Sequence, residues 1–151
     1  MSGARALPLT PERQRTLHTV VGRILPGTFG PGAAAADAAV SIERVLGQRV
    51  FAPLRPGMEA MLDQLQAHSE QRYGAEFSSC SADQQDTLVG AIEQDENPVM
   101  RFLFRSLIAL SLEGLLGDPA HGGNRDFLGW EFIGRRAGDV RAGFCRAAQE
   151  G

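Results

Sequence analysis

The residues best suited to chemistry or recognition lie between Asp118 and Gly134, in the run Asp-Pro-Ala-His-Gly-Gly-Asn-Arg-Asp-Phe-Leu-Gly-Trp-Glu-Phe-Ile-Gly. Adjacent glycines open backbone angles that other residues avoid, and the Asn that follows them can pin a turn through its side chain. Trp130, the only tryptophan of the chain, offers a large amphipathic ring. This mixture predicts a shaped surface that is presented to a binding partner or ligand.

A glycine-rich loop can hold a phosphate group, because its backbone N–H groups point at the anion. A dinucleotide fingerprint, however, needs a preceding strand and the spacing G-x-G-x-x-G, whereas these glycines follow a helical pattern and lack that spacing. A structural turn at the base of the fold would also explain the glycines. A recognition surface accounts better for Arg125, Asp126 and Trp130, since Trp and Arg are enriched among interface anchors.

The remaining candidate groups form no recognisable active site. The sequence contains three histidines: His18, His68 and His121. They show neither the i, i+4 spacing nor the nearby cysteines of a metal site. Serines cluster around Cys80, but Ser81 and Gln84 have the spacing of a helix capping box, and no Gly-x-Ser-x-Gly elbow is present. We therefore expect no catalytic, cofactor-binding or metal-binding residue in this chain.

Helices must position the loop, because apolar residues recur at helical spacing and no stretch alternates like a strand. The first helix is expected to start at Thr10-Pro11 and to stop at Pro26-Gly27, where a cap and a breaker stand. The others are expected over 33–46, after Pro56 as far as Tyr73, after the Ser81 cap through Ile92, and over about 99–116 with Gly117 as C-cap. Residues after Gly134 form either a short amphipathic helix or a tail that orders against a partner.

The helix over 99–116 is apolar nearly all round, which is typical of a core helix covered by several neighbours. Arg101, Arg105 and Glu113 interrupt it, and charges at bilayer depth are costly, so we do not expect it to span a membrane. The predicted fold is all-α, a compact bundle of about five or six helices with a C-terminal Gly-rich recognition loop and tail. It forms a single domain over 1–151, with the core at about 10–135 and the tail at 136–151.

Composition narrows the choice of partners and compartment. The 151 residues carry a net charge of -3, which gives no support for nucleic-acid binding. Cys80 and Cys145 are too few for a disulfide scaffold, although Cys145 could pair with a partner chain. The first ten residues lack the apolar core of a signal peptide. We expect a cytoplasmic location for the sequence as written, or a periplasmic one if it is exported with its partner or has lost a signal peptide.

The run that begins at Asp118-Pro119 resembles the C-terminal signature of the gluconate 2-dehydrogenase subunit 3 family. The matching residues are His121-Gly-Gly-Asn-Arg-Asp126, Gly129-Trp130 and Ile133-Gly134, with His121 where the family usually has an aromatic residue. Other features agree in order, and the resemblance covers roughly residues 10 to 135. They are Ile24-Leu25-Pro26, Pro31-Gly32-Ala33, and Phe77 ahead of Ser81 to Leu88.

The resemblance implies a non-catalytic small subunit of a sugar, glycoside or polyol dehydrogenase complex. Such a subunit binds and stabilises, in a chaperone-like way, a large FAD-dependent flavoprotein of the glucose–methanol–choline (GMC) oxidoreductase class. FAD would lie in that partner and not in this chain, and a cytochrome c subunit often takes the electrons. Many members carry a twin-arginine export signal, which this sequence lacks.

The loop is our prediction for the contact with the large subunit. The predicted partner-binding residues are His121, Gly122, Gly123, Asn124, Arg125, Asp126, Gly129 and Trp130. Three alternatives stay open: the loop could buttress the bundle itself, the chain could be a stand-alone helical enzyme or ligand-binding protein that uses the His121-Gly-Gly-Asn loop, or it could be a free-standing helical scaffold.

Overall fold

The computed structural model describes residues 7–28, 30, 32 and 36–134, and within these ranges every regular element is a helix, which confirms the predicted all-α fold. Six α-helices are described: α1 (Pro11–Ile24), α2 (Ala38–Leu46), α3 (Arg55–Tyr73), α4 (Ala82–Glu93), α5 (Pro98–Leu116) and α6 (Leu128–Phe132). Four short 3-10 turns join them: η1 (Arg49–Phe51), η2 (Phe77–Ser79), η3 (Pro119–His121) and η4 (Arg125–Phe127).

Local capping explains where three of the helices begin. The Thr10 hydroxyl accepts a hydrogen bond from the N–H of Arg13 at the start of α1, as predicted. Ser81 and Gln84 exchange both bonds of the predicted capping box at the start of α4. The Asn97 side chain likewise accepts from the backbone at the start of α5, ahead of Pro98.

Three helix ends differ from the sequence-based prediction. Helix α3 begins at Arg55, so Pro56 lies in its first turn and not ahead of it. The second helix begins at Ala38 and not near residue 33, because Asp37 adopts a left-handed conformation (φ 51°) that a helix cannot continue through; residues 33–35 lie outside the described residues. Gly117 does cap α5, since its N–H donates to the carbonyl of Glu113. It is extended (φ −72°, ψ 178°) and lacks the left-handed geometry common at C-cap glycines.

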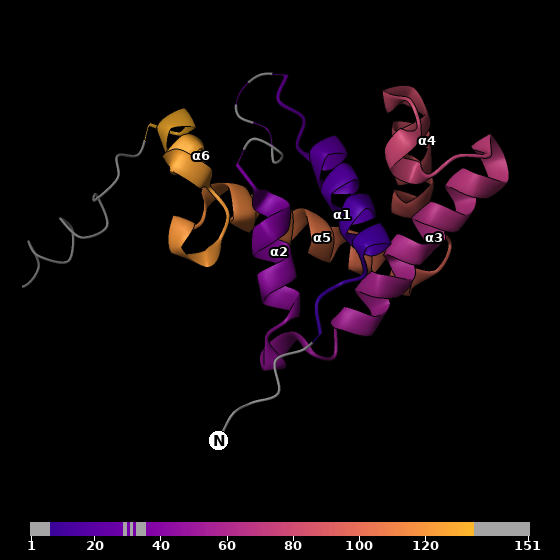
Figure 1. Ribbon diagram of the computed structural model, residues 1–151, viewed down its shortest axis with the longest axis horizontal. Coiled ribbons are helices and arrows are strands. Elements are labelled where there is room, and N and C mark those ends of the chain that lie inside the picture. Colours follow the sequence, from indigo (N-terminus) through magenta and orange to yellow (C-terminus); the bar gives the residue numbers. More distant parts are fainter. Residues whose placement is uncertain (1–6, 29, 31, 33–35, 135–151) are drawn as a thin grey trace, which may run out of the picture.

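Helix α5 is the central helix of the bundle, as predicted. It packs against α1, α2, α3, α4 and α6. Figure 1 shows it running behind α1 and α2, with α4 and α6 towards opposite ends of the molecule. The carboxyl end of α5 therefore lies on the side of α2 and α6, away from α3 and α4.

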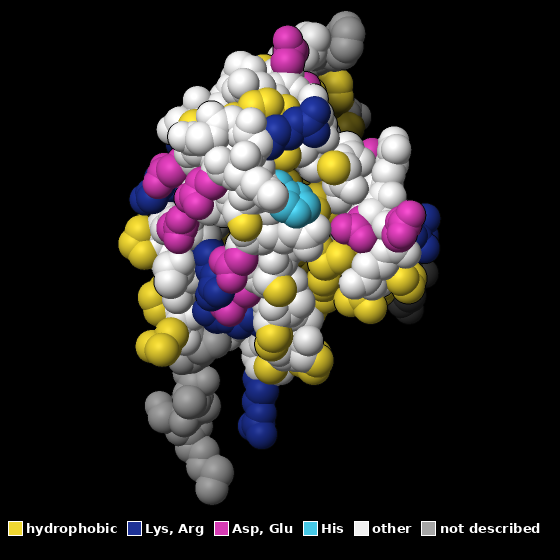
Figure 2. Space-filling view, turned by 90° about the vertical axis from the view of Figure 1, so that its right-hand side faces the viewer, with side chains coloured by type: hydrophobic (Ala, Val, Ile, Leu, Met, Phe, Trp, Pro, Cys, Tyr) yellow, Lys and Arg dark blue, Asp and Glu magenta, His cyan; other side chains and the backbone are white. Residues whose placement is uncertain are grey.

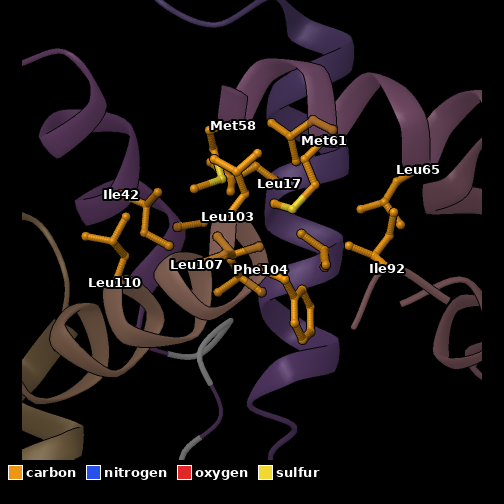
Figure 3. Packing of buried hydrophobic residues seen from close by; sticks show 14 of the residues in the cluster. Leu17, Ile42, Met58, Met61, Leu65, Ile92, Leu103, Phe104, Leu107 and Leu110 are labelled. Atoms are coloured by element: carbon orange, nitrogen blue, oxygen red, sulfur yellow. The ribbon is translucent and has the colours of Figure 1, made fainter. Parts of the chain in front are cut away.

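The hydrophobic core forms where α1, α2, α3 and α4 meet α5. In Figure 3, Ile42 of α2 lies beside Leu110 of α5, and Met58 and Met61 of α3 lie near Leu17 of α1. These side chains are almost or wholly excluded from solvent. Full burial of a side chain of this size contributes about 1.5–3 kcal/mol, so this cluster supplies the main stabilising force of the bundle.

One side of α5 is not covered, which corrects the expectation that the helix is buried all round. Val99 is 58% exposed, Phe102 60% and Leu112 41%. Five neighbouring helices cover the other faces, and none lies over this one in the described part of the chain. No described helix is both long and apolar enough to cross a membrane.

Charged pairs link α1 to its neighbours on the surface. The guanidinium of Arg13 donates two hydrogen bonds to Asp63 of α3, at 2.8 and 2.7 Å, and Arg23 binds Asp86 of α4 in the same way at 2.7 Å. These hydrogen bonds hold the pKa of the Asp63 and Asp86 carboxyls below their usual range. Figure 2 shows acidic and basic side chains interspersed on the face formed by α3 and α4.

Candidate functional site

The segment over residues 117–134, called the capping loop here, folds back over the carboxyl end of α5. A helix leaves its last carbonyl groups without partners inside the helix. Asn124 supplies hydrogen-bond donors to two carbonyl groups at this end of the helix. Its backbone N–H donates to the carbonyl of Gly114 at 2.6 Å, and its side-chain amide donates to that of Gly117 at 2.8 Å. Its side-chain oxygen accepts from the N–H of Gly129 at 2.8 Å. Asn124 is fully buried and thereby joins α5, the loop and α6.

Trp130, the middle residue of the short helix α6, completes this cap. Its indole Nε1–H donates to the carbonyl of Leu116 at 2.6 Å, and the residue is only 6% exposed. The ring also packs against Phe127, with the centroids 5.4 Å apart and the planes tilted by 38°. Such aromatic pairs contribute about 0.5–1.5 kcal/mol beyond their burial. The tryptophan therefore anchors the loop to its own helix.

Three glycines allow this part of the chain to pack backbone against backbone. A Cβ on Gly123 would overlap the carbonyl oxygen of Gly114, and one on Gly129 would overlap that of Leu115. A Cβ on Gly114 would lie 2.8 Å from the carbonyl oxygen of Ala38 at the start of α2. No larger residue fits at these positions without moving α2, α5 or the loop.

Three neighbouring amide groups of the loop donate to the chain itself. The N–H of Gly122 donates to Pro119, that of Asn124 to Gly114, and that of Arg125 to Ala36. A phosphate cradle needs these donors free and pointing at the anion. The geometry therefore argues against the cradle and supports the structural turn that the sequence also allowed.

Unusual backbone conformations concentrate at this end of the molecule. In the described part of the chain, four residues other than glycine have positive φ: Asp37, Asn124, Asp126 and Phe127. The left-handed conformation costs roughly 1–2 kcal/mol for such residues, with Asn and Asp the most tolerant. The contacts of Asn124 and Trp130 therefore also hold the loop in a shape that it would not adopt alone.

The predicted partner-binding residues divide into two groups. Gly123, Asn124, Gly129 and Trp130 are buried against their own chain. Gly122 is half-buried at φ 103°, beneath the guanidinium of Arg44. The side chains left for a partner to reach are exposed and are those of His121, Arg125 and Asp126. Partner binding at these positions remains a prediction.

Arg125 also ties the loop to α2. Its guanidinium lies 3.2 Å from Asp37, and its backbone N–H donates to the neighbouring Ala36 at 3.1 Å. The residue is nevertheless exposed, since 58% of its side chain is open to solvent. One side chain can thus both support the loop and remain accessible.

A groove of about 540 Å³ lies beside the capping loop, between α2 and the carboxyl half of α5. We call it the α2–α5 groove. It is lined by Ser41, Val45, Phe51, Leu112, Glu113, Leu116, Gly117 and His121. Of these, only His121 is a site residue that was predicted from the sequence. For Leu112 and Leu116 the sequence signal was the excess of apolar residues on α5, whereas Ser41, Val45 and Phe51 gave no such signal.

Other candidate groups are accounted for within the fold. His18 lies 2.8 Å from the Glu43 carboxylate, and Cys80 is a buried free thiol 3.6 Å from the Ser69 hydroxyl. Among the described residues, no three His, Cys, Asp or Glu side chains are grouped to hold a metal ion. Cys145 and its predicted pairing lie outside the described residues.

Comparison with known proteins bears on the whole of this arrangement. The family model described as gluconate 2-dehydrogenase subunit 3 matches residues 11–138, a range that runs from the start of α1 through the capping loop. No curated protein and no solved structure gives a significant match. Because the family model spans most of the chain, the protein belongs to the gluconate 2-dehydrogenase subunit 3 family.

Proposed function

We propose that this chain is the non-catalytic small subunit of a sugar, glycoside or polyol dehydrogenase, and that it binds and stabilises a large FAD-dependent subunit of the GMC class. The observation that carries this proposal is the family match over residues 11–138. Membership of this family suggests an accessory subunit of a dehydrogenase complex. FAD and the reacting sugar belong to the partner in this proposal, with a cytochrome c subunit as an electron acceptor.

The stabilising effect would follow from mass action. A protein that binds the folded large subunit and not its unfolded chain shifts the equilibrium towards the folded form. At a concentration 100 times the Kd, this shift is worth about 2.7 kcal/mol. That is a large share of the roughly 5–15 kcal/mol that separates folded from unfolded proteins, so no catalytic action is needed for a chaperone-like role.

The surface around the capping loop supports binding to a protein. Phe132 and Ile133 of its last turn are 58% and 54% exposed, and Leu112 of α5 is 41% exposed beside the groove. Phe132 and Ile133 are neighbours in the chain, and adjoining exposed apolar side chains mark interaction sites more often than isolated ones do. The complex would lie in whichever compartment the large subunit occupies.

The proposal is tested by producing the proposed large flavoprotein subunit with and without this chain. We expect the small subunit to raise the yield of soluble, FAD-loaded flavoprotein and to co-elute with it in size-exclusion chromatography. Dehydrogenase activity towards gluconate and other sugars should follow the flavoprotein. An equal yield, stability and activity of the flavoprotein alone, together with separate elution, would contradict the proposal.

The division of the loop into buried and exposed residues decides which contact variants are informative. Trp130→Ala would disrupt the cap of α5, so a lost complex would not distinguish binding from folding. Arg125→Ala removes an exposed side chain and one ion pair with Asp37. If Arg125 contacts the partner, this variant should bind the flavoprotein less tightly while the free chain melts within a few degrees of wild type.

A further inference from the structure

The α2–α5 groove has apolar walls and two polar side chains, Ser41 and Glu113, that bind no other described residue. We propose that it is the docking site for an apolar side chain of the large dehydrogenase subunit that has a lysine or arginine beside it. The inference rests on the proposed function and adds the place of contact and the chemistry of the contacting segment.

The walls of the groove suit an apolar anchor. Val45, Phe51 and Leu116 are half-buried, and Leu112 is 41% exposed at the edge. Val50, which precedes Phe51 in the chain, is an exposed apolar side chain outside the groove lining (75% exposed). Interface anchors are side chains that fill pockets of this kind near the middle of a larger contact.

The floor of the groove holds a polar group that an occupant could satisfy. Ser41 is only 7% exposed, and within the described part of the chain its hydroxyl makes no hydrogen bond. No described side-chain polar atom is both buried and without a hydrogen-bond partner, so solvent still reaches this hydroxyl from the groove, and an occupant that displaces the water has to replace its hydrogen bond. A segment that enters the groove would bring backbone groups within hydrogen-bonding distance of this hydroxyl. A purely apolar side chain could not form that hydrogen bond.

The edge of the groove favours a cation. The Glu113 carboxylate is exposed and forms no ion pair with any described residue. It lies in the last turn of α5, where the helix dipole is negative. Arg44, on neighbouring α2, packs over Gly122 and does not form an ion pair with Glu113. A lysine or arginine of the partner would therefore meet an unpaired acid at the negative end of a helix.

The family signature shapes this groove indirectly. Gly117 and His121 line it, and both belong to the capping loop that Asn124, Gly123 and Gly129 hold against α5. The buried signature residues thus place the groove wall, and the contact itself is made by His121 and by residues of α2 and α5. In this proposal the capping loop contributes to recognition mainly by positioning the wall of the groove, and less by touching the partner.

Photo-crosslinking in the complex tests the site directly. A benzoylphenylalanine that replaces Leu112 should crosslink to the large subunit, at a peptide that contains an apolar residue next to Lys or Arg. The same group in place of Phe102 is the matched control, because Phe102 is also exposed on α5 but lies ten residues, or about 15 Å, away along the helix. Equal crosslinking from both positions would overturn the proposal. Crosslinks from position 112 to a second copy or to residues 135–151 of the same chain would do so too.

Binding measurements give an independent readout in the full-length chain. We expect Leu112→Glu to weaken binding of the large subunit about tenfold or more and Phe102→Glu to leave it within about twofold, since truncated anchors dominate interface affinity. Glu113→Gln should weaken binding about threefold and reduce its sensitivity to salt. Urea unfolding of each free variant shows whether the fold is intact.

The outcomes separate this proposal from the broader one. If wild type forms the complex and Leu112→Glu binds equally well, the groove is not the docking site, but the role as a small subunit stands. If wild type forms no complex with the flavoprotein, both proposals fail. Reduced binding by Leu112→Glu and Phe102→Glu alike would place the contact along α5 as a whole and would reject the groove.

Discussion

The two ends of this bundle are held together by different means. Around α1, α3 and α4, apolar side chains fill the core and bidentate pairs such as Arg23–Asp86 bridge the surface. Around α2, α5 and the capping loop, main chains touch one another through glycines and are joined by the hydrogen bonds of Asn124. The first end depends on side chains that can adjust, whereas the second depends on backbone positions that cannot.

This difference has energetic consequences. Exposed ion pairs contribute only about 0–1 kcal/mol each, because water screens them. Forcing extra atoms into a packed region costs about 1–3 kcal/mol, and more where the neighbour is main chain. The end formed by α2, α5 and the capping loop, called the capping end here, should therefore be far more sensitive to small substitutions. It is also the end that carries the α2–α5 groove, so the rigid part of the molecule is the part that we propose for recognition.

The largest effect is expected for Gly129→Ala in the capping loop. Its Cβ would overlap the carbonyl oxygen of Leu115, so either α5 or the loop must move. We expect a loss of about 3 kcal/mol or more in the free energy of unfolding, measured by urea denaturation. The indole of Trp130 should also become more exposed, which tryptophan fluorescence reports.

Gly90→Ala in α4 is the matched control at the other end. A Cβ on Gly90 would meet nothing within 4 Å, and the residue lies inside a helix. This substitution should stabilise the protein by about 0.5–1 kcal/mol, since Gly is the weaker helix former. Similar destabilisation by both changes would remove the contrast between the two ends.

A smaller loss is expected when Asn124 is replaced. Asn124→Ala removes two side-chain hydrogen bonds and leaves a left-handed residue without the tolerance of Asn, which should cost about 2–3 kcal/mol in total. Asn124→Gly removes the same bonds but accepts φ 47°, so its cost should be about 1 kcal/mol lower. If Gly proves no better than Ala in urea unfolding, the backbone conformation contributes nothing to the rigidity of this end.

The sequence predicted those features that depend on near neighbours along the chain. The starts of α1 and α4 follow from caps that act across three residues, Thr10 to Arg13 and Ser81 to Gln84. The position of Gly117 at the end of α5 follows from the same local logic. Such features need no knowledge of the rest of the fold.

The arrangement of the candidate site could not be predicted in the same way. Glycine in a sequence signals either a turn or a close approach, and only the fold shows that Gly123 and Gly129 meet α5. The contact of Arg125 with Asp37 spans 88 residues. The uncovered side of α5 depends on how many helices surround it, so a helix that is apolar all round does not reveal where its groove lies.

The smallest effect is expected at the surface pairs of α1. Asp86→Asn breaks the bidentate pair with Arg23, but 51% of the Asp86 side chain is exposed, so we expect a loss of only about 0.5 kcal/mol at pH 7 after solvent screening. The hydrogen bonds from Arg23 hold the pKa of the Asp86 carboxyl below the usual range of an aspartate. Its contribution to stability is therefore complete above about pH 4 and is lost as the pH falls through the lower pKa of the folded state.

Wild type and Asp86→Asn should accordingly converge in urea unfolding as the pH falls below about 4, while they differ slightly at pH 7. Glu96→Gln changes the net charge by the same amount at an exposed site where no ion pair is formed with described residues, so it should match wild type at both values. A loss for Asp86→Asn as large as that for Gly129→Ala would mean that the charged pairs are as essential to the bundle as the backbone contacts. The sensitivity of the capping end would then be a general property of the fold and no longer a feature of the part that we propose for recognition.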